Sequence, residues 1–404
     1  MRKIKSENQI LIMLAFFSVS MGLWENFRQL WLQGNGFSAT NISNIISIGT
    51  LISVVGIMFV GKHIKLSKLK TFVSCSLIIK FLNLIFILYL NNRGNMNLIN
   101  ISIIIDVLTG YLVTTSIYPL ITTIIKNNTI YSKRKLTEYL FKDVGILVGG
   151  LLIGRSVIGI LVNYNVCLFI SIVFLAISIL VMFNMSACKN IENKQGENVS
   201  IIKYILKSKL QVIYMIYSFI GAMAMSTALG LKMLTLTNYF KFSDNQATNY
   251  LLIVGLAADI IGILALKYLT PKNDYITITI KFGIRFIAYV IAFLSNNIII
   301  TLIAMTWSIL ISTSYENICD GYYVNEIDNK YQLTFTNFRY VIRYLGEATG
   351  IFLCGVMYEI GLRYMFGLSA FFLIFQIGLA YYLIYLRKKE RYIQWNMLEI
   401  KIII

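Results

Sequence analysis

Apolar residues occur along this chain in long runs that short polar stretches interrupt. A run of about 20 apolar residues crosses the hydrocarbon core of a bilayer when it is helical. The apolar residues of these runs do not alternate with polar ones, as they would in a membrane β-barrel. We therefore predict an all-α membrane protein with twelve transmembrane helices, at roughly 9–32, 41–61, 71–90, 97–125, 140–162, 166–187, 209–233, 249–268, 276–294, 297–318, 337–360 and 364–386.

One long polar interruption, at 188–208, lies near the middle of the chain. We interpret it as a cytoplasmic linker between an N-terminal six-helix bundle at 1–187 and a C-terminal six-helix bundle at 209–386. Residues 387–404 begin with several cations and are predicted to form a cytoplasmic tail.

A glycine pattern recurs in both halves. Its members are Gly145, Gly149 and Gly154 in the first half and Gly346, Gly350 and Gly355 in the second, at an offset of 201 residues. The cation three residues before the first glycine also recurs, as Lys142 and Arg343. Small residues four apart let two membrane helices approach closely. The repeat therefore predicts packing glycines on equivalent helices of two bundles that a pseudo-twofold axis relates.

Composition and charge agree with a membrane protein. Hydrophobic residues are 57% of the chain and charged residues 13%, about half the charged fraction of a soluble domain. The net charge is +18, but the cations concentrate on one side of the predicted topology, and only Arg93, Lys241 and Arg363 fall in outside loops. This bias predicts a cell-membrane protein with both termini in the cytoplasm. It also explains the basic excess without a nucleic-acid partner.

Residues that would carry out enzymatic chemistry are sparse. The chain has one histidine, His63, and its five cysteines form no CxxC pair. No HExxH sequence and no glycine-rich phosphate loop is present. We therefore expect neither an enzyme nor a cofactor or metal site.

Several charges fall inside the predicted spans, where each needs a partner or a water-filled cavity. Glu25, Arg28, Asp106 and Arg155 all fall in the outer half of the N-terminal bundle, so either acid can pair with Arg155. Each acid is either a solute or proton contact or a member of a structural ion pair. We interpret Lys80, near a span end, as facing lipid or a neighbouring helix with little functional weight.

Two acids fall inside spans of the second half. Asp259 lies in the middle of its span without a local partner, which suits proton pick-up and release. Glu347 follows Arg343 by four residues, so the two can pair along one helix face. With the four residues of the first half, Asp259 and Glu347 complete our candidates for the substrate and proton pathway.

Three local sequences resemble motifs of the major facilitator superfamily. Residues 145–154 are similar to its antiporter motif gxxxGPxxGG, with Gly150 in place of the proline and Ile153 in place of one glycine. The basic loop at 61–70 stands where the family has GxxxDRxGRR, without the aspartate. Asp106 and Gly110 stand where the family has RxxxG, with an acid in place of the arginine.

This resemblance implies a fold of two six-helix bundles whose first and fourth helices line a central cavity, near Glu25 and Asp106. It also implies a secondary transporter that works by alternating access, in which the two bundles rock around one site. We expect a monomer, in contact with membrane lipids, that exports a small amphipathic drug or metabolite in exchange for protons. A lipid or saccharide-lipid flippase, an uptake permease and a membrane sensor of the same fold remain alternatives.

Overall fold

The structure is a computed structural model of the chain. It describes residues 6–64, 68–90, 95–124, 138, 141–149, 160–185, 205–206, 208–268, 274–295, 297–310 and 329–403.

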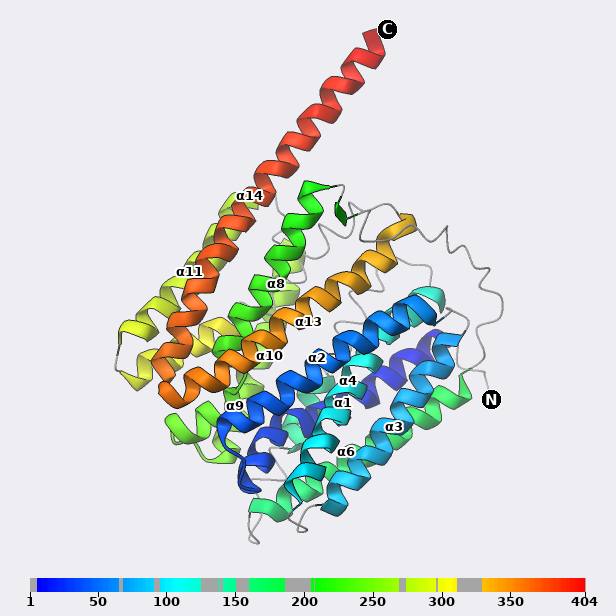
Figure 1. Cartoon of the computed structure of the whole chain (residues 1–404), viewed down its shortest axis with the longest axis vertical. Coiled ribbons are helices and arrows are strands. Elements are labelled where there is room, and N and C mark those ends of the chain that lie inside the picture. The colour runs from blue at the N-terminus through cyan, green and yellow to red at the C-terminus, as the bar shows by residue number, and fades with distance from the viewer. Residues whose placement is uncertain are drawn as a thin grey trace.

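The described parts of the chain are built from helices, as predicted (Figure 1). The helices of the first half are α1 (Ser6–Gly34), α2 (Ala39–His63), α3 (Leu69–Leu90), α4 (Met96–Ile124) and α6 (Ile160–Asn184). Those of the second half are α8 (Lys209–Leu229), α9 (Lys232–Leu234), the π-helical turn η2 (Thr235–Tyr239), α10 (Asp244–Tyr268), α11 (Asp274–Leu294), α13 (Asn329–Ile360) and α14 (Leu362–Ile403). Two further helical segments are 141–149 and Ile298–Leu310.

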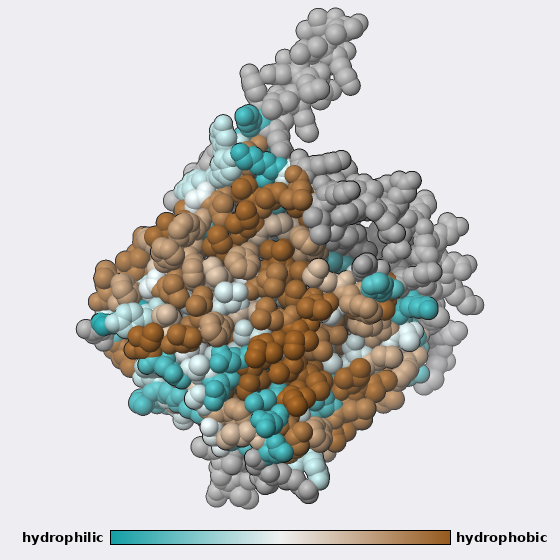
Figure 2. All heavy atoms as spheres, viewed as in Figure 1, coloured by the Kyte–Doolittle hydropathy of each residue, from teal (hydrophilic) through white to brown (hydrophobic). Residues whose placement is uncertain are grey.

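Seven of the described helices are long and apolar enough to cross a membrane. Large apolar side chains such as Val55, Phe59 and Leu82 are more than half exposed on their surface. Figure 2 shows apolar side chains over much of one face, with polar side chains gathered toward its upper and lower ends. Such a surface suits lipid, because an apolar area of this extent would aggregate in water.

The described helices overlap all twelve predicted runs, but several helix ends lie outside the predicted bounds. Helix α6 begins at Ile160, inside the run predicted to end at 162, because Asn163 and Asn165 interrupt the apolar pattern without breaking the helix. Helix α14 continues to Ile403 and its end projects away from the bundle (Figure 1). No glycine or proline follows Gly378, so the polar tail after 386 contains no residue that stops a helix.

The helices of each half pack mainly on one another. In the first half α1 packs on α6, and α4 packs on both α2 and α3. In the second half α8 packs on α13 and α14, and α11 packs on α14. The two halves meet along α2 and α13, which lie side by side in Figure 1.

The repeated glycines lie where helix backbones touch. A Cβ atom added at Gly145 would lie 3.0 Å from the Cα atom of Gly22 and closer still to the carbonyl oxygen of Val19, both on α1. A Cβ atom at Gly346 would collide in the same way with the carbonyl oxygen of Phe219 on α8. Val19 and Phe219 are 200 residues apart, close to the 201 of the glycines. The repeat read from the sequence is therefore present in the packing.

The remaining repeated glycines have different contacts. Gly149 lies against the ring of Phe27, and Gly350 against the backbone of Met223. Gly355 lies against Ser43 of α2, so it serves the contact between the two halves. Gly154 lies outside the described residues.

Hydrogen bonds join the two halves at the end of the bundle that the predicted topology places outside, which we call the outer end. The Gln29 side chain donates to the carbonyl oxygen of Gly230 at 2.8 Å. The Tyr164 hydroxyl donates to Asp244 at 2.5 Å. Thr40 donates to the carbonyl oxygen of Gly355 at 3.3 Å. These bonds hold α1, α2 and α6 of the first half to the second half.

The glycine contacts lead to a prediction about stability. Gly145→Ala and Gly346→Ala should each destabilise the fold by about 1–3 kcal/mol, the usual cost of forcing an extra group into a packed interior. The matched control is Gly378→Ala on α14, where an added Cβ atom meets nothing within 4 Å. Thermal unfolding of the purified protein should show a lower Tm for the first two variants and an equal or higher Tm for the control. Equal Tm values for all three variants would contradict the packing role.

Candidate functional site

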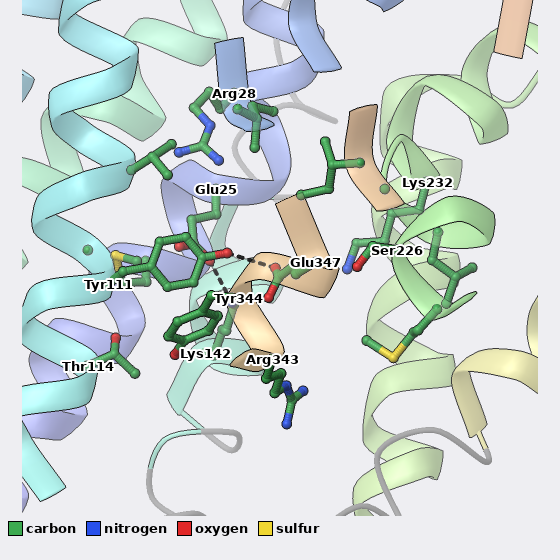
Figure 3. Close-up of a pocket in the computed structure, with 18 of the residues that line it drawn as sticks. Glu25, Arg28, Tyr111, Thr114, Lys142, Ser226, Lys232, Arg343, Tyr344 and Glu347 are labelled. Carbon is green, nitrogen blue, oxygen red and sulfur yellow. Dashed lines mark hydrogen bonds and ion pairs between the residues drawn. The ribbon is translucent and has the colours of Figure 1, made fainter. Parts of the chain in front are cut away.

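A cavity of about 440 Å³ lies between the two halves. Side chains of α1, α4 and the segment 141–149 line it from the first half, and side chains of α8, α9 and α13 line it from the second (Figure 3). Seven ionisable residues line this cavity: Glu25, Arg28, Glu138, Lys142, Lys232, Arg343 and Glu347. Its volume falls in the range of sites for small molecules, roughly 300–1,000 Å³.

A buried ion cluster lies behind one wall of the cavity. Asp106 of α4 is fully buried and accepts hydrogen bonds from Arg28 Nη1 at 2.8 Å and Trp24 Nε1 at 2.9 Å. Its other carboxylate oxygen binds Lys80 of α3, which is 1% exposed and also donates to the Asp106 carbonyl oxygen at 3.1 Å. Two cations therefore share one carboxylate, and the cluster carries a net positive charge.

Glu25 and Lys142 form a second ion pair on the cavity surface. Lys142 Nζ lies 2.5 Å from Glu25 Oε2. The side chains are 27% and 37% exposed for Glu25 and Lys142, so water in the cavity can reach both. The pair joins α1 to the segment 141–149. Glu25 and Lys142 each lie within one helical turn of the Gly22–Gly145 contact.

Glu347 of α13 is linked to the first half through Tyr111 of α4. The Tyr111 hydroxyl donates a hydrogen bond of 2.7 Å to Glu347 Oε1 across the cavity (Figure 3). The Tyr111 ring also packs edge-on against Tyr344, with ring centroids 4.4 Å apart. One hydrogen bond and one ring contact thus connect the two halves at the centre of the molecule.

Two further cations line the cavity from the second half. Lys232 extends from α9 into the cavity in Figure 3, and Arg343 points from α13 toward the opposite end. Lys142 and Arg343, the cations that recur before the glycines, therefore both reach the same cavity.

The structure locates four of the six candidate residues. Glu25, Arg28 and Glu347 line the cavity, and Asp106 lies buried beside Arg28. Among the described residues, Asp106 binds Arg28 and Lys80, and Glu25 binds Lys142. The expected pairing of either acid with Arg155 stays a prediction, because Arg155 lies outside the described residues. Glu347 has a partner on the other half, which its spacing from Arg343 did not indicate.

The other two candidates remain predictions. Asp259 lies on α10, but its side chain is outside the described part of the structure, and Arg155 is outside it altogether.

Sequence reasoning missed several residues of the site. Lys80 faces the neighbouring helix α4, one of the two orientations that we expected, but we did not foresee that its ammonium group is buried against Asp106. A signal for this was present on α3, where the polar residues Ser76, Lys80 and Asn83 recur on one helix face and are all buried. Lys232 and Tyr111 carried no distinctive spacing. Lys142 did carry a signal, its recurrence as Arg343, which could have marked it as facing the cavity.

The buried cluster yields a prediction about which charge the fold needs. Asp106→Asn should destabilise the protein by about 3–5 kcal/mol, because it leaves two buried cations without a counter-charge. Lys80→Met should cost much less, since the Asp106–Arg28 pair remains neutral. The measurement is thermal unfolding in detergent. The control is the double variant Asp106→Asn with Lys80→Met, which should recover part of the stability that Asp106→Asn loses. A Lys80→Met variant as unstable as Asp106→Asn would contradict this charge balance.

Comparisons with known proteins agree with the architecture. No protein-family model matches the sequence, and no curated protein matches it. Among solved structures, the chain is similar to the nucleoside transporter NupG, with a TM-score of 0.67, 13% identity and coverage of 95% of this chain and 100% of that one. It is similar to FucP, a major facilitator superfamily transporter, with a TM-score of 0.65, 12% identity and coverage of 93% and 98%.

A third similar structure is a bacterial homologue of the human lysosomal transporter Spinster, with a TM-score of 0.67, 13% identity and coverage of 95% and 97%. At such low identity these likenesses report the path of the backbone, which they match over nearly the whole of both chains. The chain therefore has the fold of the major facilitator superfamily transporters.

Proposed function

We propose that this protein is a secondary active transporter that moves a small solute across the membrane by alternating access. The observation that carries the proposal is the cavity between the two halves, which both halves line with charged side chains. Charged groups are costly inside a membrane protein, and they are retained chiefly where a solute or ion passes. The fold supports the same function, because the solved structures of this fold described above are transporters.

The proposed mechanism needs two arrangements of the halves, which we take to be bundles of six membrane-spanning helices. Three hydrogen bonds hold the halves together at the outer end, between Gln29 and Gly230, Thr40 and Gly355, and Tyr164 and Asp244. Each hydrogen bond contributes about 1 kcal/mol net, so a few such contacts can be exchanged for others at the opposite end. These contacts support a state in which the outer end is closed.

Protons are the proposed coupling ion, and the cavity carboxylates are the proposed carriers. Glu25 and Glu347 line the cavity, where Glu25 accepts a hydrogen bond from Lys142 and Glu347 accepts one from Tyr111. Asp106 is fully buried between two cations, so we now assign it a positioning role toward Arg28. Asp259 on α10 is retained as a candidate in the second half.

We propose export of a small amphipathic compound from the cell, with both termini in the cytoplasm. The cavity combines charged groups with apolar side chains such as Phe17, Met21 and Ile46, which suits a solute with a polar and an apolar part. The likeness of residues 145–154 to the antiporter motif is the support for the direction. Uptake by the same cavity, or movement of a lipid, is the alternative that an experiment must separate.

Flux measurements in proteoliposomes test the proposal. The purified protein should move members of a drug and metabolite panel faster with a pH gradient than without one. Reversing the gradient should reverse the direction of net flux. Lipid scrambling that ignores the gradient would favour a flippase, and the absence of any flux across the panel and of any scrambling would contradict a transport function.

A substitution of Glu347 tests its proposed role in coupling. Glu347→Gln keeps an oxygen that can accept the Tyr111 hydrogen bond but cannot release a proton. Gradient-driven flux should fall at least about tenfold, which corresponds to roughly 1.4 kcal/mol in the activation free energy of the limiting step. Protein yield and Tm should stay near those of the parent. The matched control is Glu359→Gln, an exposed position on the same helix, which should transport normally. Normal gradient-driven flux by Glu347→Gln would remove Glu347 from the coupling mechanism.

A further inference from the structure

We propose that the outer part of the cavity binds an anionic group of the solute, a carboxylate or phosphate, between Arg28 of α1 and Lys232 of α9. The inference rests on the proposed transport function and names the class of its substrate. The chemistry is that of a small organic anion held by one cation from each half.

The positive charge of Arg28 is not fully balanced by its partners, so it is available to an anionic ligand. Asp106, its partner, is already matched by the buried ammonium group of Lys80. Lys80 and Arg28 share the single carboxylate of Asp106, so one of the two positive charges is left unbalanced within this cluster. Arg28 lines the cavity although it is only 8% exposed, and its Nε atom has no hydrogen-bond partner among the described residues. A buried guanidinium group in this state favours an incoming anion.

Lys232 provides the second cation. It lines the cavity and makes no ion pair or hydrogen bond with the part of the chain that the structure describes. The charged groups that act on it are Lys142, Glu25 and Asp143. Glu25 is bonded to Lys142, and neither Glu25 nor Asp143 forms an ion pair with Lys232 in the part of the chain that the structure describes. An ammonium group inside a membrane protein needs a counter-charge or water, and a solute anion can supply the counter-charge.

The backbone places these two cations at the same depth. Gln29, next to Arg28, donates its hydrogen bond to the carbonyl oxygen of Gly230, two residues before Lys232. Figure 3 shows Arg28 and Lys232 on opposite sides of the cavity, with the side chain of Lys232 extending toward the level of Glu347. An anion between them would touch both halves of the protein at once. Its binding would therefore favour the arrangement in which the halves are close together.

Two of the three cavity acids, Glu25 and Glu347, are less suited to a cationic solute. Glu25 accepts from Lys142, and Glu347 accepts from Tyr111. A cation would have to displace those partners, whereas an anion completes the bonding of Arg28 and Lys232. The rings of Tyr111 and Tyr344 beside the charged region offer an apolar surface for the body of the solute.

Binding measurements on the purified full-length protein test the site. The probes are benzoate, phenyl phosphate and inorganic phosphate, with neutral benzamide and cationic benzylamine as controls of similar size. The anions should raise Tm in a concentration-dependent way, because a ligand stabilises the folded state that binds it. Lys232→Gln should weaken this binding about 10- to 100-fold, the effect expected from losing a charged hydrogen bond. Lys232→Arg should retain it.

The matched control is Lys241→Gln, which removes the same charge from an exposed position nine residues further along. It should bind the anions like the parent protein. Equal stabilisation by benzamide or benzylamine, no stabilisation by any anion, or unchanged binding by Lys232→Gln would each overturn the proposal.

A second measurement needs no ligand. If Lys232 is kept for binding, Lys232→Met should leave the Tm of the ligand-free protein unchanged or raise it, since a cation without a partner is removed. Lys142→Met should lower Tm, because it strands Glu25. A lower Tm for Lys232→Met would indicate a structural cation and would overturn the assignment.

The source of the anion and the transport function are tested separately. Tm measurements of the parent and of Lys232→Gln in phosphatidylglycerol and in phosphatidylcholine distinguish a lipid phosphate from a soluble anion. If the site binds a lipid phosphate, phosphatidylglycerol should stabilise the parent more than Lys232→Gln. If it binds a soluble anion, the effect of phosphatidylglycerol should not depend on Lys232. Anion binding without gradient-driven flux would support the proposed anion site and contradict the proposed transport function. Flux of neutral or cationic compounds alone would do the reverse.

Discussion

The close contact of α1 with the segment 141–149, and of α8 with α13, is the constraint on which the cavity depends. Lipid provides no hydrophobic force between helices, so their association relies on direct packing. Gly145 allows its helix to touch the backbone of α1, and Gly346 does the same for α13 on α8. Because Lys142 and Arg343 each precede these glycines by three residues, the same contact directs a cation from each half toward the cavity.

A second constraint is the cost of charge in an apolar interior. Asp106 can be buried fully because Lys80, Arg28 and Trp24 satisfy its carboxylate, and these residues come from α1, α3 and α4. The cluster therefore ties three helices of the first half together while it orients Arg28 on the cavity wall. The cavity pairs Glu25–Lys142 and Tyr111–Glu347 involve more accessible groups, so they can change partners during a transport cycle.

The sequence predicted the fold much better than the side-chain pairs of the site. Span lengths depend on local hydrophobicity, and the repeat depends on spacing, so both are visible in one dimension. Arg28 lies 78 residues before its partner Asp106, and Lys80 lies 26 residues before it. No local rule pairs residues so far apart. The polar residues Ser76, Lys80 and Asn83 recur on one face of α3 and are all buried, so the sequence indicated the buried face of α3 but not that Asp106 is the partner of Lys80.

The two halves use the same architecture to hold different charges. Lys80 and Arg285 both lie eleven residues after the first residue of their helices, α3 and α11. Asp106 and Ser308 both lie ten residues after the starts of α4 and of the segment Ile298–Leu310. Both cations are buried, but Arg285 donates to the Tyr289 hydroxyl at 3.3 Å, which in turn bonds to Ser308. The position of the buried cation thus belongs to the fold. Among the described residues, a carboxylate neutralises this cation in the first half, where the same carboxylate also orients Arg28 on the cavity wall.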